Sequence, residues 1–195
     1  MKLNHNTKIV GKNVILVPYR NNHVLKYHNW MKSQELQKLT ASEPLTLEEE
    51  YKMQKSWQED DDKCTFIILD KSSYEQNTNE IDSMIGDTNI FIIDRETMTG
   101  EIEIMIAETS ARGKKFGWEA VVLMLVYGIL HIKIQKFEAK IATYNVVSIK
   151  LFEKLGFEEI HRSTIFDEIT LKKYVTDEWL QFLKLQCEHN LQVYS

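Results

Sequence analysis

The sequence predicts an α/β fold with three layers, in which a central mixed β-sheet carries helices on both faces. Polar and apolar residues alternate from Glu101 to Met105, the period of a β-strand that extends to Ala107. A short turn with two glycines then leads into a helix expected over Phe116 to His131. A further strand is expected from Lys136 to Ala142. Because a strand–helix–strand unit places its two strands side by side and parallel, the expected sheet contains a parallel pair.

The remaining elements follow from local patterns along the chain. The other expected strands are Val14–Val17, Cys64–Asp70, Met84–Asp94, Phe157–His161 and Ile165–Lys173. The other expected helices are His23–Lys32, a helix that begins at the Thr46–Glu49 capping box, and Asp177–Leu191. The polar stretch from Lys71 to Asp82 has no periodicity, and we expect a mobile hairpin loop there.

Composition and charge limit the classes of protein to consider. With 195 residues, 43% of them hydrophobic, the chain is expected to form one domain over residues 1–195. Its net charge of −5 argues against a nucleic-acid partner. The two cysteines are too few for a disulfide scaffold and lack metal-ligand spacing, so we expect no metal. His23 and His28 do not share a helical face and are interpreted as surface or capping residues.

No segment has the pattern of a targeting or membrane element. The first twelve residues lack an apolar stretch, and Lys2 stands where N-myristoylation needs a glycine. The most apolar run, Ala120 to Leu130, is shorter than the roughly 20 residues that span a bilayer. We therefore expect a cytoplasmic protein without a membrane partner.

The turn between the expected strand and the long helix is suited to bind a phosphate group. A helix N-terminus presents unpaired N–H groups and a partial positive charge, and glycine lets the backbone approach an anion closely. No Gly-Lys-Ser/Thr closes the turn, so it is not a P-loop, and the chain has no G-x-G-x-x-G. Taken alone, the turn is equally consistent with a basic surface loop.

Two motifs together resemble the GCN5-related N-acetyltransferase superfamily. Arg112 to Gly117 is similar to its Arg/Gln-x-x-Gly-x-Gly/Ala turn, with Lys115 where the family has its first required glycine. The segment from Asn145 to Phe157 resembles its Asn-x-x-Ser/Ala-x-x-x-Tyr-Glu-Lys-Leu-Gly-Phe signature, with Phe152 in place of tyrosine. The stretch Leu39–Tyr51 and further segments up to about residue 173 resemble the N-acetyltransferase 9 branch. The resemblance implies an acetyltransferase fold whose parallel strands splay apart.

The resemblance also implies where acetyl-coenzyme A binds. The pantetheine arm pairs with the backbone of the strand before the turn, whose N–H groups can also stabilise the oxyanion of the reaction. The pyrophosphate lies at the turn, and the second motif contacts the arm. The residues implied are Met105, Ile106, Ala107, Arg112, Gly113, Lys114, Lys115, Phe116, Gly117, Asn145, Ser148 and Phe152.

Direct transfer of an acetyl group to an amine needs a base, because α-amino and lysine groups are mostly protonated at neutral pH. Three carboxylates are placed for that role, and we rank Glu103 first, then Glu138 and Glu101. Each could equally be an exposed charged strand residue. Phe152 cannot protonate the leaving thiolate, which leaves Tyr144 or water for that step.

Three functions remain open at this stage. The first is an acetyl-coenzyme A-dependent transferase that acetylates a protein amine, N-terminal or lysine. The second is a non-catalytic module that binds acetyl-coenzyme A or a cytoskeletal partner such as tubulin or microtubules, which Lys115 and Phe152 favour. The third is acetylation of a small amine. Only the resemblance to the protein-acetylating branch ranks the first above the third.

Overall fold

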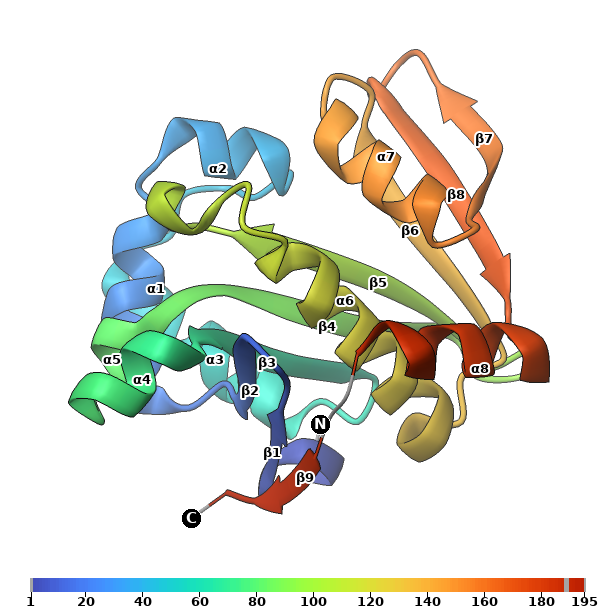
Figure 1. Ribbon diagram of the computed structural model, residues 1–195. Coiled ribbons are helices and arrows are strands. Elements are labelled where there is room, and N and C mark those ends of the chain that lie inside the picture. The colour runs from blue at the N-terminus through green and yellow to red at the C-terminus, as the bar shows by residue number, and fades with distance from the viewer. Residues whose placement is uncertain (1, 188–189, 195) are drawn as a thin grey trace.

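The computed structural model describes residues 2–187 and 190–194, and in this part of the chain a nine-stranded sheet forms the centre of the molecule (Figure 1). The strand order is β7-β8-β6-β5-β4-β3-β2-β1-β9. The strands are β1 Thr7–Val10, β2 Val14–Pro18, β3 Lys63–Asp70, β4 Met84–Asp94, β5 Thr99–Ile106, β6 Lys136–Ala142, β7 Glu158–Ser163, β8 Glu168–Tyr174 and β9 Asn190–Val193. β5 and β6 pair in parallel, and the other described ladders are antiparallel. The predicted mixed sheet is confirmed.

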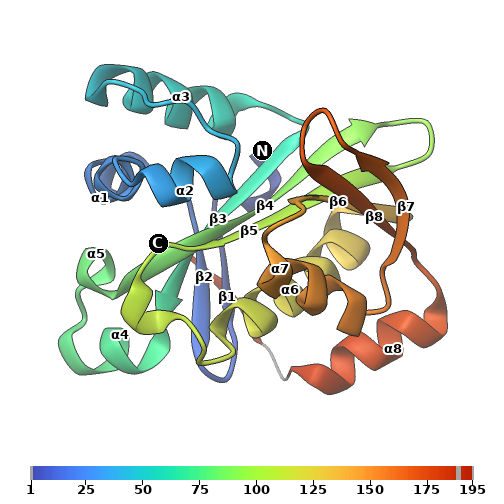
Figure 2. The ribbon, with the colours of Figure 1, turned by 90° about the horizontal axis from the view of Figure 1, so that it is seen from above.

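Helices cover both faces of this sheet, which confirms the three-layer prediction. The helices are α1 Val24–Trp30, α2 Gln34–Leu39, α3 Leu47–Glu59, α4 Lys71–Asn77, α5 Glu80–Ser83, α6 Phe116–Tyr127, α7 Val146–Lys154 and α8 Asp177–Gln186. Seen from above, α1 to α3 lie on one side of the strands and α6 to α8 on the other (Figure 2).

Two hydrophobic clusters, one on each face, hold the layers together. On the α6 face, Leu123 and its neighbours pack against Phe66 and Phe137, all at most 1% exposed. On the α1 face, Val24 and Tyr27 pack against Ile67 of β3. Fully burying one large apolar side chain contributes roughly 1.5–3 kcal/mol, so α6, whose residues 119–127 are all buried, is a major stabilising element.

The prediction for residues 71–82 was wrong. This segment forms the two short helices α4 and α5 instead of a mobile hairpin loop. Side-chain oxygens of Asp70 and Asn79 accept hydrogen bonds from the backbone N–H groups of Ser73 and Asp82, so each helix has its own cap. Caps of this kind start helices in sequences that lack hydrophobic periodicity.

His23 and the C-terminal segment also differ from expectation. His23 is fully buried, not a surface residue, although its ring does cap a turn by accepting a hydrogen bond from Arg20 N–H. The predicted helix Asp177–Leu191 ends at Gln186, and residues 188–189 of that prediction lie outside the described residues. Residues 190–193 instead form β9 and pair with the unpredicted strand β1. Pairing with a strand distant in sequence is invisible to a local pattern.

Candidate active site

The parallel strands β5 and β6 separate after a short ladder. Their register covers three pairs and ends at Glu101 opposite Glu138. β5 continues to pair with β4 as far as Ile106, and β6 pairs with β8 as far as Ala142. Figure 1 shows the two strands diverging from this point. The predicted splay is therefore present, and beyond Glu101 the edge of β5 that faces β6 has no strand partner among the residues that the structure describes.

The side chains and main chain of the last β5 residues face different surroundings. Met105 and Ala107 are 6% and 7% exposed and pack into the cluster on the α1 face, and Ile106 packs on the α6 face. The side chains of Met105, Ile106 and Ala107 are thus used for packing. Any ligand in the splay would meet mainly their backbone groups, as a pantetheine arm requires.

The turn that follows β5 leads directly into the N-terminus of α6. Gly113 and Lys115 both adopt left-handed backbone conformations, with φ of 76° and 64°. Gly113, Lys114 and Lys115 are exposed, and Phe116 and Gly117 are partly buried. The backbone N–H of Glu119 donates a hydrogen bond to the Lys115 carbonyl at 3.1 Å, which is the first hydrogen bond of the helix. The backbone N–H groups of the helical residues before Glu119 have no acceptor within the helix. Lys115 thus takes a conformation that glycine adopts without steric cost.

Arg112 is held by two partners at the entrance to this turn. Its Nε donates to the carbonyl oxygen of Ile106 at 3.0 Å, and its Nη1 binds Glu35 Oε1 of α2 at 2.7 Å. The guanidinium thus lies between the end of β5 and α2. Its charge therefore stays next to the turn that leads into α6.

The second motif lies on α7, along β6. Asn145 is the N-cap, and its side-chain oxygen accepts from the backbone N–H of Ser148 at 3.2 Å. Phe152 is 2% exposed and packs edge-on against Phe157, with ring centroids 5.0 Å apart. Phe152 is therefore a core residue in this structure. Tyr144 is exposed, and its hydroxyl donates to the Lys38 carbonyl of α2 at 3.0 Å.

The three carboxylates ranked as bases share one face of the sheet but differ in their partners. Glu101 forms a 2.7 Å ion pair with Lys140, and Glu138 lies 3.3 Å from Lys136. Glu103 lies 3.9 Å from Lys63, and 48% of its side chain is exposed. Loss of solvent around the carboxyl raises the pKa of Glu103, and Lys63 opposes this rise.

A fourth carboxylate lies on the same face and was missed from the sequence. Asp87 in β4 is 3% exposed and is the register partner of Met105. Asn89 donates to its Oδ2 at 2.8 Å, and its Oδ1 has no hydrogen-bond partner. Burial raises the pKa of Asp87 to about 7, with a further contribution from the charge of Glu103. The available signal was an acidic residue in the interior of a predicted strand, because charged side chains are rarely buried.

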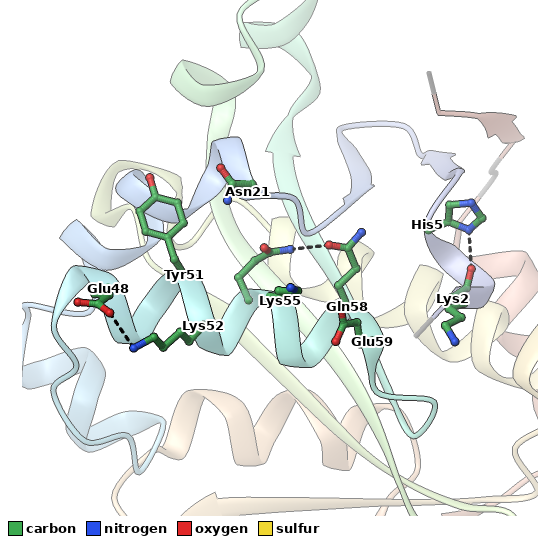
Figure 3. A pocket seen from close by; sticks show the side chains of 10 residues that line it. Lys2, His5, Asn21, Glu48, Tyr51, Lys52, Lys55, Gln58 and Glu59 are labelled. Atoms are coloured by element: carbon green, nitrogen blue, oxygen red, sulfur yellow. Dashed lines mark hydrogen bonds and ion pairs between the residues drawn. The ribbon is translucent and has the colours of Figure 1, made fainter.

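A separate surface groove of about 750 Å³ lies along the outer side of α3 (Figure 3). Long polar side chains such as Lys52, Lys55 and Gln58 line it, together with Lys2 and His5 from the N-terminal segment. None of the predicted site residues lines this groove, so it is not the site of the predicted chemistry. Among the described residues, no group of His, Cys, Asp and Glu side chains is arranged to hold a metal ion.

The parts of the splay match the chemical features of acetyl-coenzyme A. The unpartnered edge of β5 offers backbone groups to an amide-containing arm, and the start of α6 offers N–H groups to phosphates. Apart from its two chain neighbours, no described residue has a heavy atom within 4 Å of where a Cβ of Gly113 would be, so the turn is open on that side. The residues present therefore fit this cosubstrate.

Comparisons with known proteins agree with this reading of the geometry. Residues 13–158 match the acetyltransferase (GNAT) domain family. The human alpha/beta-tubulin-N-acetyltransferase 9 is 53% identical over 193 residues, covering 97% of this chain and 93% of the relative. The Drosophila melanogaster protein of that name is 50% identical over 200 residues and covers 100% of both chains.

The fold is also that of solved acetyltransferases. A spermidine N-acetyltransferase from Vibrio cholerae, crystallised with CoA and spermine, superposes with a TM-score of 0.72. The match covers 87% of this chain and 98% of that one at 16% identity. In the part of the chain that the structure describes, no helix is both long and apolar enough to cross a membrane. From the family match, the relatives and the splayed sheet together, the chain belongs to the GNAT acetyltransferase family and is an N-acetyltransferase.

Proposed function

We propose that the protein transfers the acetyl group of acetyl-coenzyme A to a protein amine, with tubulin as the candidate substrate, in the cytoplasm. The observation that best supports acetyl transfer is the separation of β5 and β6. It leaves one edge of β5 without a described strand partner beside the N-terminus of α6. The choice of a protein amine rests on the relatives. Two of them are named as tubulin acetyltransferases, and about half of their residues are identical to those of this chain.

The chain's own groups have defined roles in this proposal. Backbone groups of Met105 to Ala107 bind the pantetheine arm and polarise the thioester carbonyl. The turn from Arg112 to Gly117 and the first N–H groups of α6 bind the phosphates, and Asn145 and Ser148 at the start of α7 flank the arm. When bound, acetyl-coenzyme A supplies an activated acetyl thioester.

The acceptor amine approaches from the face that carries the carboxylates. Glu101 and Glu138 are paired with lysines at 2.7 and 3.3 Å, which reduces their capacity to bind a cation. Glu103 lies 3.9 Å from Lys63, is influenced less strongly by the charge of Lys140, and is half exposed. Glu103 is therefore the predicted carboxylate best placed to bind the acceptor ammonium. Holding amine and thioester together supplies most of the rate enhancement.

The test is an acetylation assay with three acceptor classes. The purified protein and acetyl-coenzyme A are incubated with tubulin, with peptides of the tubulin N-termini, or with spermine and spermidine. Released coenzyme A gives the rate, and mass spectrometry locates the added acetyl group. Acetylation of tubulin or its peptides supports the proposal. Turnover only with small amines would replace the substrate class, and cofactor binding without turnover would favour a non-catalytic module.

A further inference from the structure

A buried polar cluster lies between β3–β5 and the helices α1 and α3. Along β4, Asp87 is the register partner of Met105 and Asn89 is the partner of Glu103, so all four side chains share one face. Asp87 and Asn89 are 3% and 4% exposed. The cluster therefore lies directly against the segment of β5 that borders the splay.

Several polar atoms in this cluster have no hydrogen-bond partner. They are the hydroxyl of Tyr19, Oε2 of Glu50 and Oδ1 of Asp87. Burial raises the pKa of the Tyr19 hydroxyl, and the charges of Glu50 and Asp87 raise it further, so both carboxylates act on this hydroxyl. Buried polar groups are nearly always paired, and unpartnered ones that gather beside a reaction site indicate a place where a polar ligand binds.

The carboxyl group of Asp87 is fixed in orientation by a chain of side chains. Thr65 donates to Asn89 Oδ1, and Asn89 Nδ2 donates to Asp87 Oδ2 at 2.8 Å. One oxygen is thus engaged and the other is left to accept. The titratable groups that interact with Asp87 from the surrounding elements are Tyr19 after β2, Tyr27 on α1, Lys63 on β3 and Glu103 on β5. Glu50 on α3 acts in turn on Tyr19 and Tyr27.

We propose that Asp87 accepts the proton that the acceptor amine loses during acetyl transfer, an inference that rests on the proposed function. The proton passes to Oδ1 directly or over one water molecule, the range in which general bases act. Asp87 receives it while the new C–N bond forms and the C–S bond breaks with its electron pair on sulfur. The resulting thiolate is then protonated by water.

Asp87 suits this task better than Glu103. A base works best when its pKa lies near the working pH, and burial raises the pKa of Asp87 to about 7. Glu103 is half exposed, and its negative charge contributes to that rise. In this proposal Glu103 binds the acceptor ammonium, and its negative charge helps to keep the pKa of Asp87 raised. The competing hypothesis is that Glu103 is itself the base.

The test compares pH–rate profiles of four proteins with whichever acceptor the wild type uses, from about pH 6 to about pH 9. These are the wild type, Asp87→Asn, Glu103→Gln, and Asp94→Asn as a matched control at the exposed end of the same strand. The wild type should lose kcat/KM below an inflection near pH 7. Asp87→Asn should lose that inflection and roughly 10²–10⁴-fold of the rate. Glu103→Gln should keep the inflection at a lower pH, and Asp94→Asn should match the wild type.

A second measurement, without acetyl-coenzyme A, detects the titration itself. Because its folded-state pKa is raised, Asp87 destabilises the fold increasingly as pH rises from about 4 toward 7. In urea unfolding, Asp87→Asn should therefore be more stable than the wild type at about pH 8, and the difference should vanish near pH 4. A variant that is less stable at every pH would show that Asp87 is a structural residue.

The outcomes separate this inference from the proposed function. An Asp87→Asn protein with near-normal kcat/KM and an intact inflection overturns the role of Asp87 alone. Loss of the inflection in Glu103→Gln, with its retention in Asp87→Asn, assigns the base to Glu103. A wild type without turnover on any acceptor overturns the proposed function, and the role of Asp87 in it falls as well.

Discussion

Glu35 of α2 and Arg112 of the turn before α6 form a 2.7 Å ion pair across 77 residues of sequence. The pair neutralises part of the cationic charge that the turn presents. In Glu35→Gln, Arg112 keeps its bond to the Ile106 carbonyl but no longer faces a carboxylate. Since exposed pairs are worth about 1 kcal/mol or less, we expect coenzyme A to bind about two- to fivefold more tightly at low salt.

Isothermal titration calorimetry at two salt concentrations measures this effect. Glu43→Gln, which removes the same charge from the neighbouring exposed loop, is the control for long-range electrostatics. A weaker affinity in Glu35→Gln would show that the pair positions Arg112 for the phosphates instead of competing with them.

Lys115 is a non-glycine residue in a left-handed conformation, with φ of 64°. That conformation costs an L-residue roughly 1–2 kcal/mol, and glycine adopts it without the steric penalty. Lys115→Gly is therefore expected to raise the free energy of unfolding by about 1 kcal/mol, measured by urea denaturation. Lys114→Gly, at a neighbouring position without a positive φ, should give no gain. Equal effects of the two substitutions would contradict the strain argument.

Gly117 lies where α6, the end of β5 and α7 come together. A Cβ at this position would lie 3.4 Å from Ile106 Cγ1 and 3.9 Å from Leu151 Cδ1. Gly117→Ala should therefore be tolerated, whereas the branched side chain of Gly117→Val should overfill the space beside the splay. We expect coenzyme A affinity to be nearly unchanged in the first variant and at least about tenfold lower in the second, by calorimetry. Unchanged affinity in both would place the phosphates elsewhere.

The sequence predicted those parts of the site whose signals are local. The strand before the turn, the turn itself and the helix after it each follow from a few consecutive residues, and the structure has all three. The left-handed conformations of Gly113 and Lys115 and the N-cap role of Asn145 were not predicted. The exact end of the parallel ladder at Glu101 and Glu138 depends on how two strands diverge in space. No run of neighbouring residues encodes that, so the splay was expected only from the resemblance.

The elements and residues missed from the sequence depend on distant contacts. β1 and β9 form by pairing with each other, although the paired residues are 180 to 186 positions apart. The role of Asp87 is visible only when β4 is placed beside Met105 and beneath α1 and α3. The Glu35–Arg112 pair likewise appears only after α2 is folded over the turn.

Glu80 of α5 joins three segments that the sequence analysis treated separately. Its Oε1 lies 2.6 Å from His23 Nε2 and also accepts a hydrogen bond from the Tyr194 hydroxyl at 2.6 Å. Burial acts to raise the pKa of Glu80, but the bonds from His23 and Tyr194 outweigh it and hold the pKa below its usual value. A carboxylate with a lowered pKa stabilises the fold above its unfolded-state pKa, and this contribution is lost as pH falls through the folded-state pKa.

Glu80→Gln is therefore expected to lower the free energy of unfolding at neutral pH by about 1–3 kcal/mol, the cost of removing a charged hydrogen-bond partner. The difference from the wild type should shrink as pH falls below about 4.5, where the carboxyl of the unfolded chain becomes protonated, and it should be lost below the lowered folded-state pKa. Urea denaturation at several pH values measures both effects. Tyr194→Phe removes one of the two bonds and should reproduce part of the loss, together with faster hydrogen exchange in β1 and β9. A loss in Glu80→Gln that is independent of pH would show that packing, and not the carboxylate charge, joins α5 to His23 and Tyr194.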